Sequence, residues 1–109
     1  MTVRELTDLE GFTALNMPEP DREIGGAYIG DLLSWVIGHA NKDNAWVTIM
    51  TNVNILAVAA LTDVACIILA DGTELNSELI ATAKDKGINV ISSTLTSYGV
   101  ARILAAFGI

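Results

Sequence analysis

Four short polar segments each follow an apolar stretch that predicts a β-strand, and they hold the side chains best suited to binding a ligand. In an open sheet of parallel strands, ligands bind beyond the carboxyl ends of the strands. The segments are Gly30-Asp31, Thr51-Asn52-Val53-Asn54, Asp71-Gly72-Thr73 and Ser92-Ser93-Thr94. Their polar groups, together with helix N-termini, suit a neutral polar ligand, or a phosphate held by backbone amides. The candidate ligand-binding residues at this edge are Asp31, Thr51, Asn52, Asn54, Ser92 and Thr94.

A plain structural interpretation of these segments stays open. Ser, Thr, Asn and Asp are common in turns and helix caps, where they bond to their own backbone. Replacement of Asn52 by alanine, with no effect on any ligand found, would remove that residue from the site.

A second group of candidates precedes the first of these strands. Arg22 lies in a chain that has no Lys or Arg between Lys42 and Lys84, so it could pair with a phosphate, or with a carboxylate across an interface. The structural alternative is an Asp–Arg pair that braces the loop. Two adjacent glycines in a strand mark a bulge, or a place where another backbone or a ligand comes close. The candidate residues here are Asp21, Arg22, Gly25 and Gly26.

Motifs for familiar catalytic and metal chemistry are missing from the sequence. The segment Gly25–Gly30 matches neither the dinucleotide-binding motif nor the P-loop, because no lysine follows Gly30. His39 is the only histidine and has no second ligand at metal-binding spacing. Cys66 lies in an apolar run, which favours a small buried side chain over a reactive thiol. We therefore expect no enzyme activity, no metal and no cofactor.

Length and charge narrow the class of protein. The chain has 109 residues, which predicts one domain over residues 1–109. Its net charge of −7 argues against binding to nucleic acid or to anionic membrane surfaces. No apolar run approaches the ~18 residues that span a bilayer, and no secretory signal is visible. With a single cysteine, the chain fits a reducing cytoplasm.

The order of elements predicts an α/β fold. Residues 1–20 predict a helix that begins at the capping box Thr2–Glu5, then a short strand over 12–15 and a loop. Residues 21–109 predict a repeating β–α core, and we expect Asp31 to cap its first helix. Alternating strands and helices with short joins indicate a mostly parallel sheet of about four to five strands with helices packed on it. The expected strands are 24–29, 45–50, 64–70 and 88–91, and the expected helices are 32–40, 52–61, 77–86 and 97–107.

The helix predicted over residues 52–61 is apolar on every side of its Ile55–Leu61 part. A helix without a polar face is buried all round, and 51 % of the chain is hydrophobic. We expect one face to meet the sheet and the other to meet a second copy of the chain. The alternative is a helix that a terminal segment covers. The candidate dimer residues are Ile55, Leu56, Val58 and Ala59.

The sequence resembles the DRTGG domain family in its small stand-alone form. The resemblance rests on Asp21-Arg22-Glu23-Ile24-Gly25-Gly26, on its continuation from Tyr28 to Trp35, and on the segments Trp46–Asn54 and Asp63–Ala70. Glu23-Ile24 stands where the family's name has a single threonine, so no role of a threonine hydroxyl carries over.

The resemblance implies a fold similar to the N-terminal domain of HPr kinase/phosphorylase, and a regulatory or dimerising role. Such domains also occur beside nucleotide-binding CBS domains in regulated pyrophosphatases and within some phosphate acetyltransferases. Because this chain has no P-loop lysine, we do not expect kinase activity on HPr.

Our leading hypothesis is a non-catalytic, homodimeric module that regulates a metabolic enzyme or signalling partner through protein contact. The alternative is a sensor of a small ligand, such as a nucleotide, that binds at the carboxyl ends of the strands.

Overall fold

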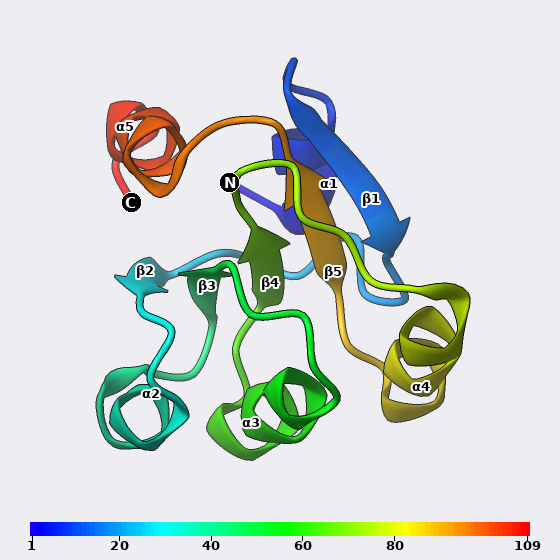
Figure 1. Cartoon of the computed structure of the whole chain (residues 1–109). Helices are drawn as coiled ribbons and strands as arrows, with labels where there is room; N and C mark the ends of the chain where they lie inside the picture. Colours follow the sequence, from blue (N-terminus) through cyan, green and yellow to red (C-terminus); the bar gives the residue numbers. More distant parts are fainter.

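The computed structural model describes residues 1–109 and confirms an α/β domain that begins with a helix. Its sheet has five strands in the order β1-β5-β4-β3-β2 (Figure 1). The strands are β1 (Phe12–Asn16), β2 (Gly26–Ile29), β3 (Asn44–Thr48), β4 (Cys66–Leu69) and β5 (Val90–Ser93). The helices are α1 (Val3–Thr7), α2 (Leu33–His39), α3 (Asn54–Thr62), α4 (Ser77–Lys86) and α5 (Ser97–Ala106). None of these helices combines the length and the hydrophobicity that a membrane crossing requires.

The sheet is parallel except at one edge. Strands β2 to β5 pair in parallel, as expected for β–α units. The N-terminal strand β1 pairs antiparallel with β5, and its register shifts between Ala14 and Asn16. Consequently β1 and β2 are the two edge strands.

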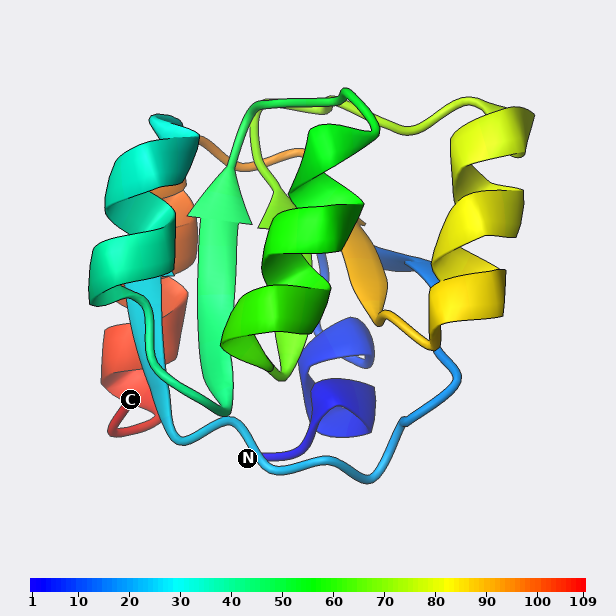
Figure 2. The ribbon, with the colours of Figure 1, turned by 90° about the horizontal axis from the view of Figure 1, so that it is seen from below.

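Helices cover both faces of the sheet. Helices α2, α3 and α4 lie side by side on one face (Figure 2), and α1 and α5 lie on the other (Figure 1). Each face has its own buried core: Trp46 and Ile67 belong to the first, and Cys66 and Ile68 belong to the second. The alternation of side chains along β3 and β4 supplies both cores, which explains why these strands are buried throughout.

The predicted capping box is confirmed, and α4 is capped at both ends. Thr2 and Glu5 form a capping box on α1, and Asn76 caps α4 by accepting the N–H of Leu79 at 2.9 Å. Gly87 ends α4 with a φ of +70°, a left-handed conformation that glycine adopts without strain.

The prediction that Asp31 caps α2 is wrong. Helix α2 begins after Leu32 without a side-chain cap. The Asp31 carboxylate instead accepts the Thr48 hydroxyl at 2.7 Å and the Ile49 N–H at 3.0 Å. It faces β3 because this pairing satisfies donors at the end of that strand.

The four candidate dimer residues lie in the protein's own core. Ile55 and Leu56 are fully buried, and Val58 and Ala59 are nearly so, because they face the sheet. A dimer contact on α3 remains a prediction, and it would have to use the exposed side of the helix, which carries Ala57 and Leu61. No terminal segment covers that side, where Leu61 is 69 % exposed.

Candidate functional site

The ten predicted ligand-binding residues divide between opposite edges of the sheet. Six of them lie at or just after the carboxyl ends of strands, as expected. The other four precede β2 or begin it, at the edge where parallel strands start. The two groups therefore do not form one site.

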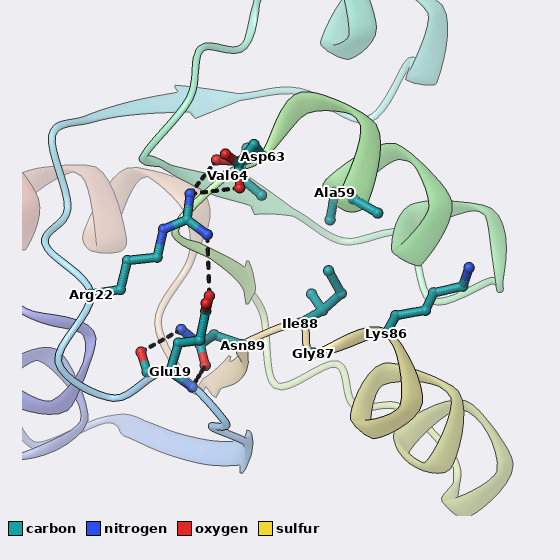
Figure 3. A pocket seen from close by; sticks show the side chains of 10 residues that line it. Glu19, Arg22, Ala59, Asp63, Val64, Lys86, Gly87, Ile88 and Asn89 are labelled. Carbon is teal, nitrogen blue, oxygen red and sulfur yellow. Dashed lines mark hydrogen bonds and ion pairs between the residues drawn. The ribbon is translucent and has the colours of Figure 1, made fainter.

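Arg22 is the centre of an ion-pair network at the amino-end edge. Its guanidinium donates to Asp63 Oδ1 at 2.8 Å and to Glu19 Oε2 at 3.2 Å (Figure 3). It also donates to Asp43 Oδ1 at 2.9 Å and to the backbone oxygen of Asp63 at 2.6 Å. Burial opposes its charge, but the hydrogen bonds to Asp63, Asp43 and Glu19 outweigh this effect and raise the pKa of Arg22.

These partners define the role of Arg22. Arg22 does brace a loop, as the structural alternative holds, but it does not pair with Asp21. Asp21 pairs instead with Arg4 at 3.1 Å. Asp43 and Asp63 both have left-handed backbones, with φ of +66° and +54°. The guanidinium thus holds two strained turns, one before β3 and one before β4.

Asn89 reinforces the same edge and was not among the predicted residues. Its amide accepts the N–H of Glu19 at 3.0 Å and donates to the carbonyl of Glu19 at 2.8 Å and of Ala65 at 3.0 Å. Asn89 is almost completely buried, so these hydrogen bonds replace those that its amide would make to water in the unfolded chain. The sequence signal was a polar residue between the apolar residues Ile88 and Val90.

A small cavity of about 210 Å³ lies between Arg22, α3 and the end of α4 (Figure 3). Its polar lining includes Glu19, Arg22, Asp63, Lys86 and Asn89. Arg22 is committed to three carboxylates, and both ends of the Asn89 amide are bonded within the chain. The lining carries two carboxylates and two cations, and one of these cations, Arg22, is already paired, so the geometry offers an incoming phosphate no excess of positive charge.

Gly25 and Gly26 differ in how much space the surrounding residues leave for a side chain. A Cβ on Gly26 would lie 3.0 Å from Asn44 Nδ2, so a side chain there would have to displace the Asn44 amide on β3. A Cβ on Gly25 would meet Asp43 only at an ordinary 3.6 Å. The chain itself therefore leaves room for a side chain at residue 25.

The carboxyl-end edge is largely occupied with its own backbone. The Asn52 amide oxygen accepts the N–H of Asn54 at 2.9 Å, and the Ser92 hydroxyl donates to the carbonyl of Thr73 at 3.0 Å. Thr51 and Thr94 are exposed. These contacts agree with the turn-and-cap alternative for Asn52 and Ser92, whereas Thr94 borders a cavity.

That cavity is apolar and has a volume of about 440 Å³. It lies between the turn before β1 and helix α5, and it is lined by Leu9, Glu10, Gly11, Thr94, Leu95, Ile103 and Phe107. A smaller hollow beside it shares Leu95 and Ile103 and adds Arg102. One predicted site residue, Thr94, therefore lies at a place where a ligand would fit.

The most distinctive surface is apolar and surrounds α2. Seven of the nine large hydrophobic side chains that are exposed lie between residues 29 and 61. We call five of them the α2 surface: Leu32, Trp35, Ile37, Ile49 and Val53. Only one charged side chain, Asp31, occurs between Glu23 and Lys42, and none occurs between Asp43 and Asp63.

An aromatic stack fixes part of this surface. The rings of Trp35 and His39 stack at 4.5 Å, and the ring of Tyr28 lies 6.4 Å from that of His39. The stack joins β2 to α2 and leaves Trp35 56 % exposed. Exposed apolar patches of this kind mark sites of interaction or ligand binding.

The chain belongs to the DRTGG domain family, because the family's sequence model matches residues 21–107. It is similar in structure to the CBS and DRTGG domains of the regulatory region of Clostridium perfringens pyrophosphatase, which was solved with its activator diadenosine tetraphosphate. The TM-score is 0.72 at 18 % identity, and the match covers 93 % of this chain but 44 % of the pyrophosphatase chain. At this identity the likeness supports the fold, and the chain spans less than half of the relative's length. No curated protein matches the sequence.

Proposed function

We propose that this DRTGG domain is a non-catalytic regulatory module that acts by contacting protein, as a homodimer and on a metabolic enzyme or signalling partner. The observation that carries the proposal is the α2 surface, where large hydrophobic side chains lie exposed on segments whose one charged residue is Asp31. Burying such side chains contributes about 25 cal/mol per Å² of apolar surface, which provides the affinity for a partner.

The chemistry of the remaining side chains supports a role without catalysis. Cys66 is fully buried, and burial raises the pKa of its thiol to about 12. The Nδ1 atom of His39 lies 2.8 Å from the Trp35 carbonyl, and the ring stacks on Trp35. Neither residue is arranged as a nucleophile or base beside a substrate-sized pocket.

A variant that removes the apolar side chains of the α2 surface tests the proposal. Leu32→Ser combined with Trp35→Ser should leave folding intact, because both side chains are more than half exposed. It should weaken association with the partner at least about tenfold. Leu61→Ser, on the exposed side of α3, is the matched control and should bind as the unmodified protein does. Equal binding by all three proteins would contradict the proposal.

The alternative role, sensing of a small ligand, is supported by the apolar cavity beside Thr94 and by the nucleotide activator of the pyrophosphatase regulatory region. A thermal-shift series with diadenosine tetraphosphate and mononucleotides tests it. A ligand present at about 100 times its Kd should stabilise the fold by about 2.7 kcal/mol. No shift with any nucleotide would remove this alternative, and native mass spectrometry of protein from its own cells would reveal a retained ligand of another kind.

A further inference from the structure

The edge strand β2 is open and lacks the usual protection against pairing with another chain. Edge strands are commonly guarded by charged side chains, prolines or bulges. The other edge strand, β1, has a register shift between Ala14 and Asn16, and α4 packs beside it. Strand β2, with the sequence Gly-Ala-Tyr-Ile, has none of these guards.

The hydrogen-bond pattern shows which backbone groups face outward. The N–H of Gly30 donates to the carbonyl of Val47 on β3 at 3.1 Å. Because strand residues alternate with a period of two, Tyr28 also bonds toward β3, and the N–H and C=O of Ala27 and Ile29 point to the open edge. Both of these residues are exposed.

We propose that β2 pairs antiparallel with β2 of a second copy of this chain, with Ala27 opposite Ile29 of the second copy and Tyr28 of both copies at the two-fold axis. This register uses all the outward backbone groups of Ala27 and Ile29, since each such pair exchanges two hydrogen bonds. It rests on the proposed function, for which it supplies the geometry of the dimer.

Charge identifies a second copy as the occupant. Two chains of net charge −7 repel one another wherever their acidic surfaces meet. Strand β2 carries no charge, and the carboxylate of Asp31, which follows it, is already bonded to Thr48 and Ile49. An antiparallel edge is also complementary to itself, because the two-fold axis brings each N–H opposite a C=O.

A dimer interface of sufficient area must also bury the side chains that flank β2. A stable dimer buries about 800 Å² per partner, which is roughly a seventh of the 5478 Å² surface of this chain. Four strand residues alone do not provide this area. The aromatic stack of Tyr28, His39 and Trp35 lies on the α2 face of the edge, and Ile29, 47 % exposed, lies on the other face. Gly25, which its own chain does not require as glycine, leaves room for the second backbone.

Disulfide trapping tests the register. Non-hydrogen-bonded antiparallel pairs have Cα atoms about 4.5 Å apart, a distance that a disulfide accepts. Tyr28→Cys should therefore form a covalent dimer on mild oxidation, and Leu61→Cys, which is exposed on α3, should not. The native Cys66 is fully buried and does not compete. Crosslinking of the two variants at equal rates would overturn the proposed register.

A proline at residue 27 tests the hydrogen bonds. Ala27→Pro removes an outward N–H and leaves the bonds between β2 and β3 in place. It should raise the dimer Kd about 100-fold in sedimentation experiments, with an unchanged circular dichroism spectrum. A dimer that Ala27→Pro leaves intact would overturn the β2 pairing but not the regulatory proposal. A wild-type protein that stays monomeric at about 100 µM would overturn the pairing, and the α2-surface variants would then decide the regulatory proposal separately.

Discussion

Arg22 connects three turns that lie far apart in the sequence, and this explains the arginine of the signature without a ligand. Glu19, Asp43 and Asp63 bond to the one guanidinium. The side chain of Arg22 is 19 % exposed, so the network is only partly screened by water.

Replacing Arg22 should therefore lower stability rather than ligand affinity. We expect Arg22→Ala to reduce the free energy of unfolding by about 2 kcal/mol, because three carboxylates and a carbonyl lose their donor. Arg22→Lys should lose about half as much, since one ammonium replaces a planar group with several donors. Urea unfolding gives both values. A loss below about 0.5 kcal/mol for Arg22→Ala would show that the network does not hold the turns.

Cys66 predicts a specific dependence of stability on pH. Burial raises the pKa of the thiol from 9.0 to about 12, while the charge of Arg22 lowers it slightly. Between pH 9.0 and about pH 12, the Cys66 thiol keeps its proton in the folded state and releases it in the unfolded state, so the free energy of unfolding falls as pH rises. From pH 8 to pH 10, the wild type should lose on the order of 1 kcal/mol more than Cys66→Ala. Urea unfolding at the two pH values measures this, and parallel curves would contradict a buried thiol.

At the scale of elements, Asp31 joins the turn after β2 to the end of β3. Its carboxylate accepts from Thr48 and from the backbone of Ile49. We expect Asp31→Ala to reduce the free energy of unfolding by about 1.5 kcal/mol, because both donors lose their acceptor. Asp31→Asn keeps an acceptor oxygen in the same place and should lose less than half of that. Equal losses for the two variants would show that the hydrogen bonds contribute little.

Local patterns explain why the elements were predictable. The capping box at Thr2, the Asn76 cap and the Gly87 stop depend on neighbours within a few residues. The bonds from Arg22 to Asp63 and from Asn89 to Glu19 were not predictable, because they depend on which strands are neighbours. Asp31 was misassigned for the same reason, since its donors lie on the adjacent strand.

The site was harder to predict than the fold. Apolar spacing in α2 indicates a helix, but it does not tell which flank the rest of the chain covers. Because β2 is an edge strand, the flank that carries Trp35 remains open. The apolar helix α3 shows the reverse, since Ile55 and Leu56 face the sheet and are fully buried.

At the scale of the whole molecule, acidic charge and apolar surface are separated. The segment between Asp43 and Asp63 has no charged side chain, whereas the chain as a whole carries a net charge of −7. Association should therefore strengthen as salt concentration rises, because salt screens the repulsion and leaves apolar contacts in place. Sedimentation at low and high salt measures this, and weaker association at high salt would indicate an interface dominated by opposite charges.

The most direct test of the central claim is acrylamide quenching of tryptophan fluorescence over a dilution series. Trp46 is fully buried, whereas Trp35 is 56 % exposed on the α2 surface, so quenching reports mainly on Trp35. If protein covers the α2 surface, the quenchable fraction should fall as the concentration rises from about 0.1 to about 100 µM, and Ala27→Pro should abolish that fall. Constant quenching over this range, with no change when a partner is added, would contradict a role of this surface in protein contact.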